Sequence, residues 1–235
     1  MSHPALRGDH HVHSTFSDDA VSTLEENVAA AERRGLTTLR LVDHVRRDTA
    51  WVPEYLAAVR ALRVPAGLTV LTGVEAKILD VGGGLDIPAL PTGIDRILIA
   101  DHQFPGVDGP LGPTAVRERI AGGWAAPDVL DQLVTALIAA MRQHPGNQLA
   151  HCFSILPKIG LSEDDLGRER IDAWARAAAE TDTHVEVNEK WGCPGRPSLD
   201  ALRASGATIV ASTDSHEAAD VGRYERVAAL LHEDA

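Results

Sequence analysis

The chain of 235 residues predicts an α/β fold in which parallel strands alternate with helices, as a barrel or as a doubly wound sheet. Seven short apolar runs are separated by helix-like stretches, and this alternation is typical of parallel strands joined by right-handed crossovers. The length suits one α/β barrel, a fold of roughly 250 residues. With 44% hydrophobic and 4% aromatic residues, the chain has enough aliphatic side chains for one core. We therefore expect a single domain over residues 1–235.

The strand candidates are short runs of β-branched or aliphatic residues. In chain order they cover residues 8–12, 39–42, 68–74, 96–100, 148–150, 184–187 and 208–211. No repeat, low-complexity tract or linker separates them into groups, so the pattern does not indicate a domain boundary.

Helices are expected over residues 23–34, 54–63, 114–143, 163–180, 198–204 and 218–232, with the third forming one helix or two. Ser22 and Gly35 bracket the first helix, Ser162 precedes the fourth, and Gly206 follows the fifth. Serine before a helix and glycine after it are ordinary start and stop signals, so the predicted boundaries agree with the periodicity.

The net charge of −12 argues against general affinity for nucleic acid or an anionic membrane, because both would repel an acidic surface. A small-molecule partner is favoured, and the oligomeric state is left open. Cys152 and Cys193 have no CxxC spacing and suit neither a disulfide framework nor a thiolate zinc site. No apolar run approaches 18 residues, and residues 1–4 lack the layout of a signal peptide, so we expect a cytoplasmic protein.

Six of the seven strand candidates end in residues that bind metals. These residues are His11 and His13, then Asp43-His44, Glu75, Asp101-His102, His151, and Asp214 with His216. The C-terminal ends of barrel strands lie on one face, where active sites are built, so these side chains could converge. Any one of them alone could be an ordinary structural residue, and the prediction depends on the joint pattern.

Spacing strengthens this interpretation for two pairs. Residues two apart in an extended strand point to the same face, so His11 and His13 can reach one ion while His10 points away. The same reasoning pairs Asp214 with His216 if the strand continues that far. Mixed imidazole and carboxylate ligands favour Zn²⁺, Mn²⁺ or Fe²⁺ over Ca²⁺ or Mg²⁺.

These motifs resemble, in order, those of the polymerase and histidinol phosphatase (PHP) superfamily over about residues 9 to 216. The matching segments are His11-Val12-His13-Ser14-Thr15-Phe16-Ser17-Asp18, Val42-Asp43-His44, Gly73-Val74-Glu75, His102, Ala150-His151 and Ser212-Thr213-Asp214-Ser215-His216. The resemblance implies a distorted seven-stranded (β/α)7 TIM-like barrel with three divalent metal ions on its C-terminal face.

The resemblance also implies a set of ligands. Glu75 would bridge two ions, one near His11, His13 and Asp214 and the other near His102 and His151, and a third ion would be held by Asp18, His44 and His216. The sequence departs from the family at Asp19, where members have glycine, so Asp19 rivals Asp18 as the ligand. Cys152 follows His151 where members often have proline.

The function expected from this resemblance is hydrolysis of a small-molecule phosphate monoester by a metal-bound hydroxide, with Glu75, Asp214 and His216 as catalytic residues. Three alternatives stay open: a phosphodiesterase, including one acting on a cyclic phosphate, a metal-dependent amidohydrolase, and a non-catalytic metal-binding accessory domain. The late Asp-Ser-His and early Ser-Asp motifs favour the phosphoesterase, and the physiological substrate is not readable.

Four cationic residues that follow strand ends are candidates for binding the phosphate: Lys77, Lys158, Lys190 and Arg196. Arginine can grip phosphate with two nitrogens and lysine acts as a point charge, although each could equally be a solvated surface charge. Arg223 is a weaker candidate. Trp191 and Phe104 could wall the pocket, and Asn188 could contact substrate or a metal-bound water.

Overall fold

The computed structural model describes residues 3–232, so the ends of the predicted domain, residues 1–2 and 233–235, lie outside the described residues. Seven strands form one sheet in the order β1-β2-β3-β4-β7-β8-β9, and every neighbouring pair is parallel. The strands are β1 Gly8–Val12, β2 Thr38–His44, β3 Thr69–Lys77, β4 Arg96–Ala100, β7 Gln148–Ala150, β8 His184–Asn188 and β9 Ile209–Ser212. All seven coincide with the predicted runs, and several extend a few residues further.

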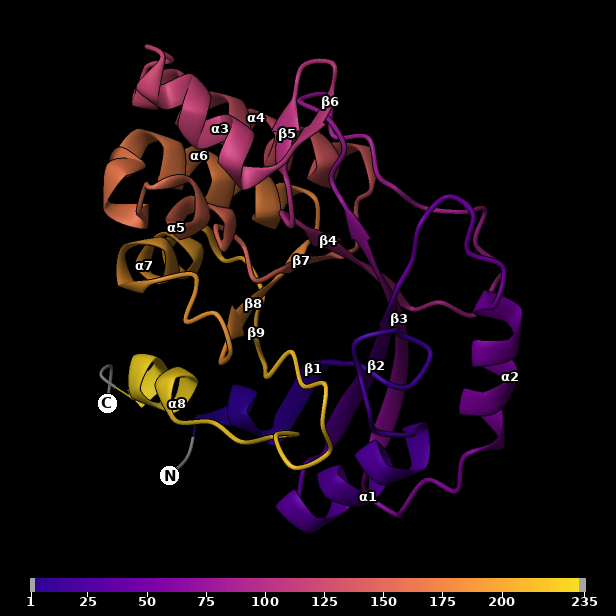
Figure 1. Cartoon of the computed structure of the whole chain (residues 1–235). Helices are drawn as coiled ribbons and strands as arrows, with labels where there is room; N and C mark the ends of the chain where they lie inside the picture. Colours follow the sequence, from indigo (N-terminus) through magenta and orange to yellow (C-terminus); the bar gives the residue numbers. More distant parts are fainter. Residues whose placement is uncertain (1–2, 233–235) are drawn as a thin grey trace.

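The sheet curves round until its first and last strands meet (Figure 1). The contact is a parallel bridge between Val12 and Ser215, just past the end of β9. There the His13 N–H donates to the Ser215 carbonyl at 2.8 Å, and the Ser215 N–H donates to the His11 carbonyl at 3.3 Å. A doubly wound sheet would leave these edges apart, so the structure confirms the distorted seven-stranded α/β barrel.

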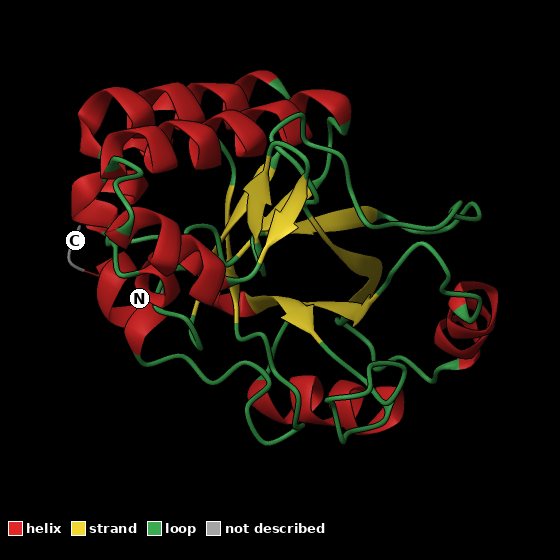
Figure 2. Cartoon of the chain, turned by 45° about the horizontal axis from the view of Figure 1, so that its top comes forward, coloured by secondary structure: helices red, strands yellow, loops and turns green. Residues whose placement is uncertain are grey.

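Helices surround the strands on the outside (Figure 2). They are α1 Leu24–Arg34, α2 Val52–Ala61, α3 Pro113–Ala121, α4 Ala126–Gln143, α5 Ile155–Ile159, α6 Gly167–Glu180, α7 Arg196–Ser205 and α8 Arg226–His232, with two 3-10 turns at Pro4–Arg7 and Glu163–Asp165. The N-cap of α1 is Thr23, whose hydroxyl accepts from the Glu26 N–H at 3.2 Å. Glycine ends α1 and α7 in the left-handed conformation, as Gly35 and Gly206 predicted.

The structure decides one helix prediction that was left open and contradicts another. The stretch 114–143 forms two helices, α3 and α4, because the chain turns at Gly123, which has a φ of 107°. The last helix was expected from residue 218 but begins only at Arg226. Residues 218–225 form a loop instead, because Gly222 has a φ of 66° and its N–H donates to the buried Asp9 carboxylate at 2.9 Å. The short helix α5 and a hairpin, β5 Phe104–Gly106 with β6 Gly109–Leu111, were not predicted.

The alternation of side chains along each strand separates the outer core from the barrel interior. Outward residues such as Leu39 and Leu41 pack with α1 in one cluster, while a larger cluster lies against α4 and α6. The separate inner cluster is small: Val42, Leu98, Ala100 and Ala150. Because so few apolar side chains fill the interior, the polar residues at the strand ends meet above it. Among the residues described, the structure has no helix both long and apolar enough to span a bilayer.

Candidate metal centre

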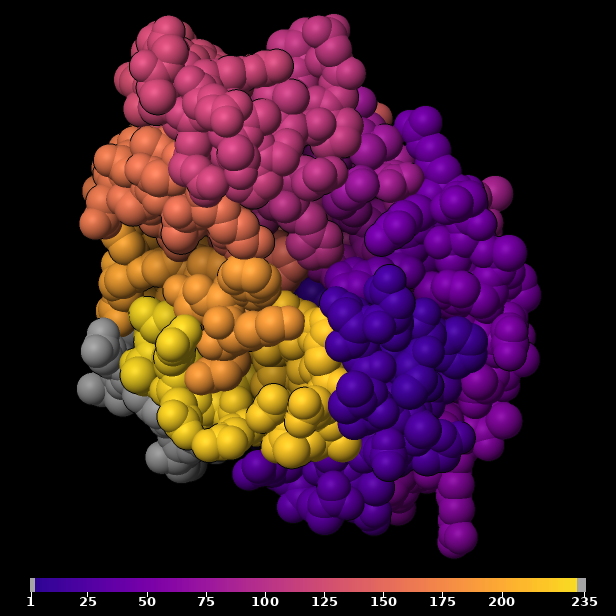
Figure 3. All heavy atoms as spheres, in the orientation of Figure 1, coloured from indigo at the N-terminus to yellow at the C-terminus, as the bar shows by residue number. Residues whose placement is uncertain are grey.

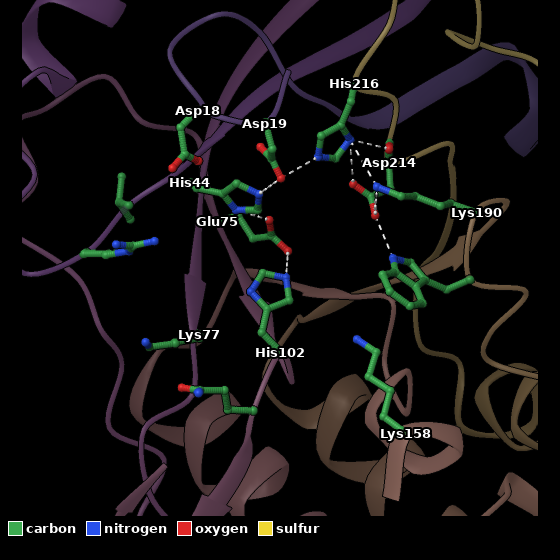
Figure 4. Close-up of a pocket in the computed structure, with 14 residues that line it drawn as sticks. Asp18, Asp19, His44, Glu75, Lys77, His102, Lys158, Lys190, Asp214 and His216 are labelled. Carbon is green, nitrogen blue, oxygen red and sulfur yellow. Dashed lines mark hydrogen bonds and ion pairs between the residues drawn. The ribbon is translucent and has the colours of Figure 1, made fainter. Parts of the chain in front are cut away.

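Glu75, on β3, lies at the centre of the barrel mouth (Figure 4) and is 1% exposed. Its two carboxylate oxygens face two different groups of imidazoles. Oε1 lies 2.9 Å from His151 Nε2 and 3.1 Å from His102 Nε2. Oε2 lies 2.8 Å from His44 Nδ1, 3.5 Å from His11 Nε2 and 3.6 Å from His13 Nε2. One carboxylate therefore faces five histidines from four strand ends.

His11 and His13 lie side by side, as their spacing in β1 predicted. Their Nε2 atoms are 2.9 Å apart, and Asp214 Oδ1 lies 3.2 Å from His13 Nε2 and 3.8 Å from His11 Nε2. The three residues form a buried group whose ligand atoms all lie within 4.8 Å of one another. The barrel closure between His13 and Ser215 brings Asp214 to this position.

A third group surrounds Asp19. The Asp19 Oδ2 atom lies 3.2 Å from His216 Nε2 and 3.4 Å from His44 Nε2, and the rings of His44 and His216 both lie against His13. Asp18 lines the same cavity, but the ion pairs of these two histidines with this loop are made to Asp19. Of the two carboxylates that the sequence left as alternatives, the structure brings Asp19 to the histidines.

The donor atoms fit divalent metal ions. Glu75 Oε2 is buried and accepts no well-aligned hydrogen bond from any described residue, although three ring nitrogens lie within 3.6 Å of it. Ring nitrogens that converge on one another and on a buried carboxylate are the arrangement of groups that share a cation. The imidazole and carboxylate donors suit Zn²⁺, Mn²⁺ or Fe²⁺.

Glu186 is a buried acid that the sequence analysis missed. Its Oε2 lies 3.1 Å from His11 Nδ1, and its Oε1 accepts from the His151 N–H at 2.6 Å. It also accepts from Asn188 Nδ2 at 2.8 Å and from Gln148 Nε2 at 2.9 Å. A carboxylate on Nδ1 orients an imidazole and leaves Nε2 for a metal. The available signal was an acidic residue at an inward position inside a strand candidate.

Two further acids at strand ends orient histidines and do not join the cluster itself. Asp43 accepts from the hydroxyls of Ser14 at 2.6 Å and Ser17 at 2.7 Å, and Ser17 Oγ lies 3.3 Å from His13 Nδ1. Asp101 accepts from Ser154 Oγ at 2.8 Å, which in turn lies 3.1 Å from His151 Nδ1. These acids act on the cluster through serine hydroxyls.

Burial and charge divide the protonation states within the cluster. Burial lowers the pKa of His13 to about 3. Burial also lowers the pKa of His151, but the neighbouring carboxylates of Asp101 and Glu75 outweigh it and raise that pKa to about 10. Burial raises the pKa of Glu75, but His102, His11 and His44 outweigh it and hold the pKa well below its usual value. Without metal, Glu75 is therefore ionised and His13 neutral, which are the forms that bind metal, whereas His151 would release a ring proton when a metal binds.

Three of the four predicted phosphate-binding cations line the cavity of about 450 Å³ beside the cluster, and Figure 4 shows them around it: Lys77, Lys158 and Lys190. Lys190 Nζ lies 3.2 Å from His216 Nδ1 and 3.5 Å from Asp214 Oδ2. Lys77 Nζ lies 3.4 Å from Asp86. Arg46 also lines the cavity and was missed because it lies in a loop without a recognisable motif.

Arg196 lies elsewhere. It begins α7, its Nε is 3.2 Å from Asp200 Oδ1, and it lines a different pocket between α6 and α7. The structure therefore does not bring it to the histidines, because Arg196 is the first residue of α7 and lies beside α6. Arg223 lines a pocket that shares Lys190, Asp214 and His216 with the first.

The two predicted wall aromatics behave differently. Trp191 lines the cavity, whereas Phe104 is fully buried and packs edge-on against Trp124 at 5.4 Å. Asn188 is buried, and besides bonding Glu186 its Oδ1 accepts from the Trp191 N–H at 3.0 Å. Phe104 is thus a packing residue, and Asn188 supports the turn that carries Trp191.

The fold and the cluster define an α/β barrel protein with a candidate metal centre on its C-terminal face. A model of the PHP domain matches residues 9–190. The chain belongs to the PHP domain family, as the motifs indicated.

Two curated relatives cover nearly the whole chain. A protein of Acetivibrio thermocellus named "Probable phosphatase" is 28% identical, over 96% of this chain and 86% of the relative. A protein of the same description from Enterobacter sp. strain 638 is 26% identical, over 96% and 84%. A solved structure of histidinol phosphate phosphatase from Lactococcus lactis, complexed with zinc, L-histidinol and phosphate, covers 96% of this chain and 92% of its own, with a TM-score of 0.66 and 15% identity. That likeness shows the fold.

Proposed function

We propose that this PHP-family protein is a metal-dependent phosphatase that hydrolyses a small-molecule phosphate monoester with a trinuclear metal centre. The observation that carries the proposal is the position of Glu75, whose two oxygens face five histidines from four strand ends. The names of the curated relatives support the class of enzyme.

Three groups of side chains would hold the ions. The first is His11, His13 and Asp214, and the second is His102 and His151, with Glu75 shared between them. The third is His44, His216 and Asp19, with Asp19 in place of Asp18. Bound divalent ions would supply an activated water near neutral pH and neutralise charge on the phosphate oxygens.

The chain's own residues would bind and orient the ester. Lys158 and Lys190 reach the cavity from α5 and from the turn after β8, and each ammonium can pair with a phosphate oxygen as a point charge. His216, 18% exposed at the rim, would hold an ion that can stabilise charge on the leaving oxygen. The acidic surface, with a net charge of −12, disfavours a polymeric anion such as nucleic acid as substrate.

The test is turnover by protein loaded separately with Zn²⁺, Mn²⁺ and Fe²⁺. We expect hydrolysis of para-nitrophenyl phosphate at a higher rate than bis-para-nitrophenyl phosphate, followed by a panel of phosphomonoesters that includes histidinol phosphate. No turnover of either chromogenic ester by any loaded form would overturn the proposal. Faster turnover of the diester would reassign the enzyme as a phosphodiesterase.

Glu75→Ala is expected to abolish activity and release metal, because it removes the carboxylate that both groups of histidines share. Glu54→Ala, an exposed position in the first turn of α2, is the matched control and should keep both. A Glu75→Ala protein that retained full activity would exclude the shared-ligand role.

A further inference from the structure

Trp191 is an aromatic side chain at the mouth of the cavity that remains 38% exposed. The turn after β8 holds its backbone in place. Asn188 N–H donates to the Cys193 carbonyl at 2.8 Å, and Gly192 N–H donates to the Asn188 carbonyl at 2.9 Å. Asn188 Oδ1 in turn accepts from the Trp191 N–H at 3.0 Å. The turn thus keeps a large, partly exposed ring beside the polar groups of the cavity.

The indole N–H of Trp191 donates to Asp214 Oδ2 at 2.7 Å. The other oxygen of the same carboxylate, Oδ1, lies 3.2 Å from His13 Nε2. The bond therefore fixes which oxygen of Asp214 faces the histidines. A hydrogen bond of this kind orients a metal-binding carboxylate and prevents it from rotating away.

The backbone of Asp214 increases the need for such a support. Asp214 has a φ of 53°, in the left-handed region that residues with a Cβ seldom adopt. A strained residue persists only where surrounding contacts hold it. Trp191 supplies a contact of this type from a different strand end.

The face of the same ring holds Lys158. Its Nζ lies 4.0 Å from the centroid of Trp191, a distance at which an ammonium is attracted to an indole face. Lysine is a flexible side chain, and this contact restricts its ammonium to the cavity wall. One indole thus contacts a candidate metal ligand with its edge and a candidate phosphate-binding cation with its face.

We propose that Trp191 is a positioning residue that aligns Asp214 for metal through its indole N–H and Lys158 for the phosphate through its ring face. The inference rests on the proposed function and deepens it. The two roles of Trp191 can be measured separately. Replacement by phenylalanine keeps an aromatic ring for Lys158 and removes the N–H that bonds Asp214, whereas replacement by leucine removes both.

The experiment compares Trp191→Phe, Trp191→Leu and Lys158→Met with the full-length wild type. Zn²⁺ affinity is measured by competition with a chromophoric chelator, and kcat and KM for para-nitrophenyl phosphate are measured at saturating metal. Trp191→Phe is expected to weaken one class of metal site about tenfold with little change in KM. Lys158→Met should raise KM severalfold and leave Zn²⁺ affinity unchanged, and Trp191→Leu should show both effects. Trp124→Phe, which packs against Phe104 away from the cavity, is the matched control and should show neither.

Circular dichroism and the thermal midpoint of each variant show whether it has folded. Wild-type Zn²⁺ affinity in folded Trp191→Phe would overturn the metal-aligning role, and wild-type KM in folded Trp191→Leu would overturn the role toward Lys158. If the wild type binds Zn²⁺ but hydrolyses no phosphate ester, the proposed function fails, while the affinity of Trp191→Phe still decides the metal-aligning part. If the wild type binds no divalent ion, both proposals are overturned.

Discussion

The acidic residues at the barrel mouth differ in whether their carboxylate oxygens face the candidate metal centre. Both carboxylate oxygens of Glu75 face imidazoles. Glu186 instead lies behind His11 and contacts Nδ1, the ring nitrogen that points away from the centre. Asp43 and Asp101 lie behind serine hydroxyls. The acidic residues at the mouth thus divide into those that could bind an ion and those that orient the metal-binding side chains.

The residue scale leads to a prediction for Glu186. Glu186→Gln keeps the shape of the side chain but removes the charge opposite His11 Nδ1, so His11 loses its fixed orientation. Removing such a supporting partner usually costs metal affinity roughly 10- to 100-fold, and we expect a loss of Zn²⁺ affinity in this range by chelator competition. Glu169→Gln, exposed on α6, is the control. Unchanged affinity in Glu186→Gln would contradict the supporting role.

Among the elements, the segment between β9 and α8 decides how the barrel closes. Its ends are tied to β1 by one buried carboxylate, Asp9. Asp9 accepts from the Thr213 hydroxyl at 2.6 Å, from the Thr213 N–H at 3.0 Å and from the Gly222 N–H at 2.9 Å. Figure 3 shows the N-terminal and C-terminal parts of the chain side by side across this face. The loop that replaces the predicted helical turns therefore brings Asp214 and His216 to the mouth.

Asp9 also gives a pH-dependent prediction. Burial raises its pKa from 3.8 to about 6, against hydrogen bonds from Thr213 and Gly222. Because the folded pKa lies above the unfolded one, the folded state binds the extra proton, and the free energy of unfolding falls as pH rises from about 4 to about 6. The full decrease is about 3 kcal/mol at 1.36 kcal/mol per pKa unit.

The measurement is urea unfolding of wild type and Asp9→Asn between about pH 4 and pH 7. Asparagine does not titrate, so the difference in unfolding free energy between the two proteins should change by about 2.4 kcal/mol across this range, with the wild type losing stability relative to the variant as pH rises. The other titrating groups are common to both proteins and cancel. A constant difference would show that Asp9 does not titrate as its burial implies.

At the scale of the whole molecule, the candidate ligands join strand ends that are far apart in sequence. His11 lies in the first strand and His13 directly follows it, and Asp214 and His216 follow the last. In the backbone, these strands are joined by the Val12–Ser215 bridge and its neighbouring hydrogen bonds. Metal ions would therefore add cross-links where the sheet is paired least.

We accordingly expect metal removal to destabilise the protein as well as inactivate it. A ligand that binds only the folded state adds about 2.7 kcal/mol at about 100 times its Kd, so chelator treatment should lower the thermal midpoint, and Zn²⁺ or Mn²⁺ should restore it. Glu75→Ala is the comparison, since it should show little chelator-dependent shift. An equal shift in the two proteins would mean that the stabilising ions bind elsewhere.

Much of this protein was predictable from local patterns. Apolar runs placed all seven strands, and the ligand-type residues at their ends marked the site, because parallel strands send their C-terminal ends to one face. The spacing of His11 and His13 also predicted their shared direction, since a strand has a period of two. These features depend on a few neighbouring residues each.

Only the tertiary structure decided the remaining features. Closure of the barrel, Asp19 at the histidines, Glu186 behind His11 and Arg196 away from the cavity all depend on how segments far apart in sequence meet. Strand periodicity predicts the direction of a side chain but not the residue that it contacts. That partner is set by the curvature of the whole sheet and by loops such as the one that holds Trp191 against Asp214.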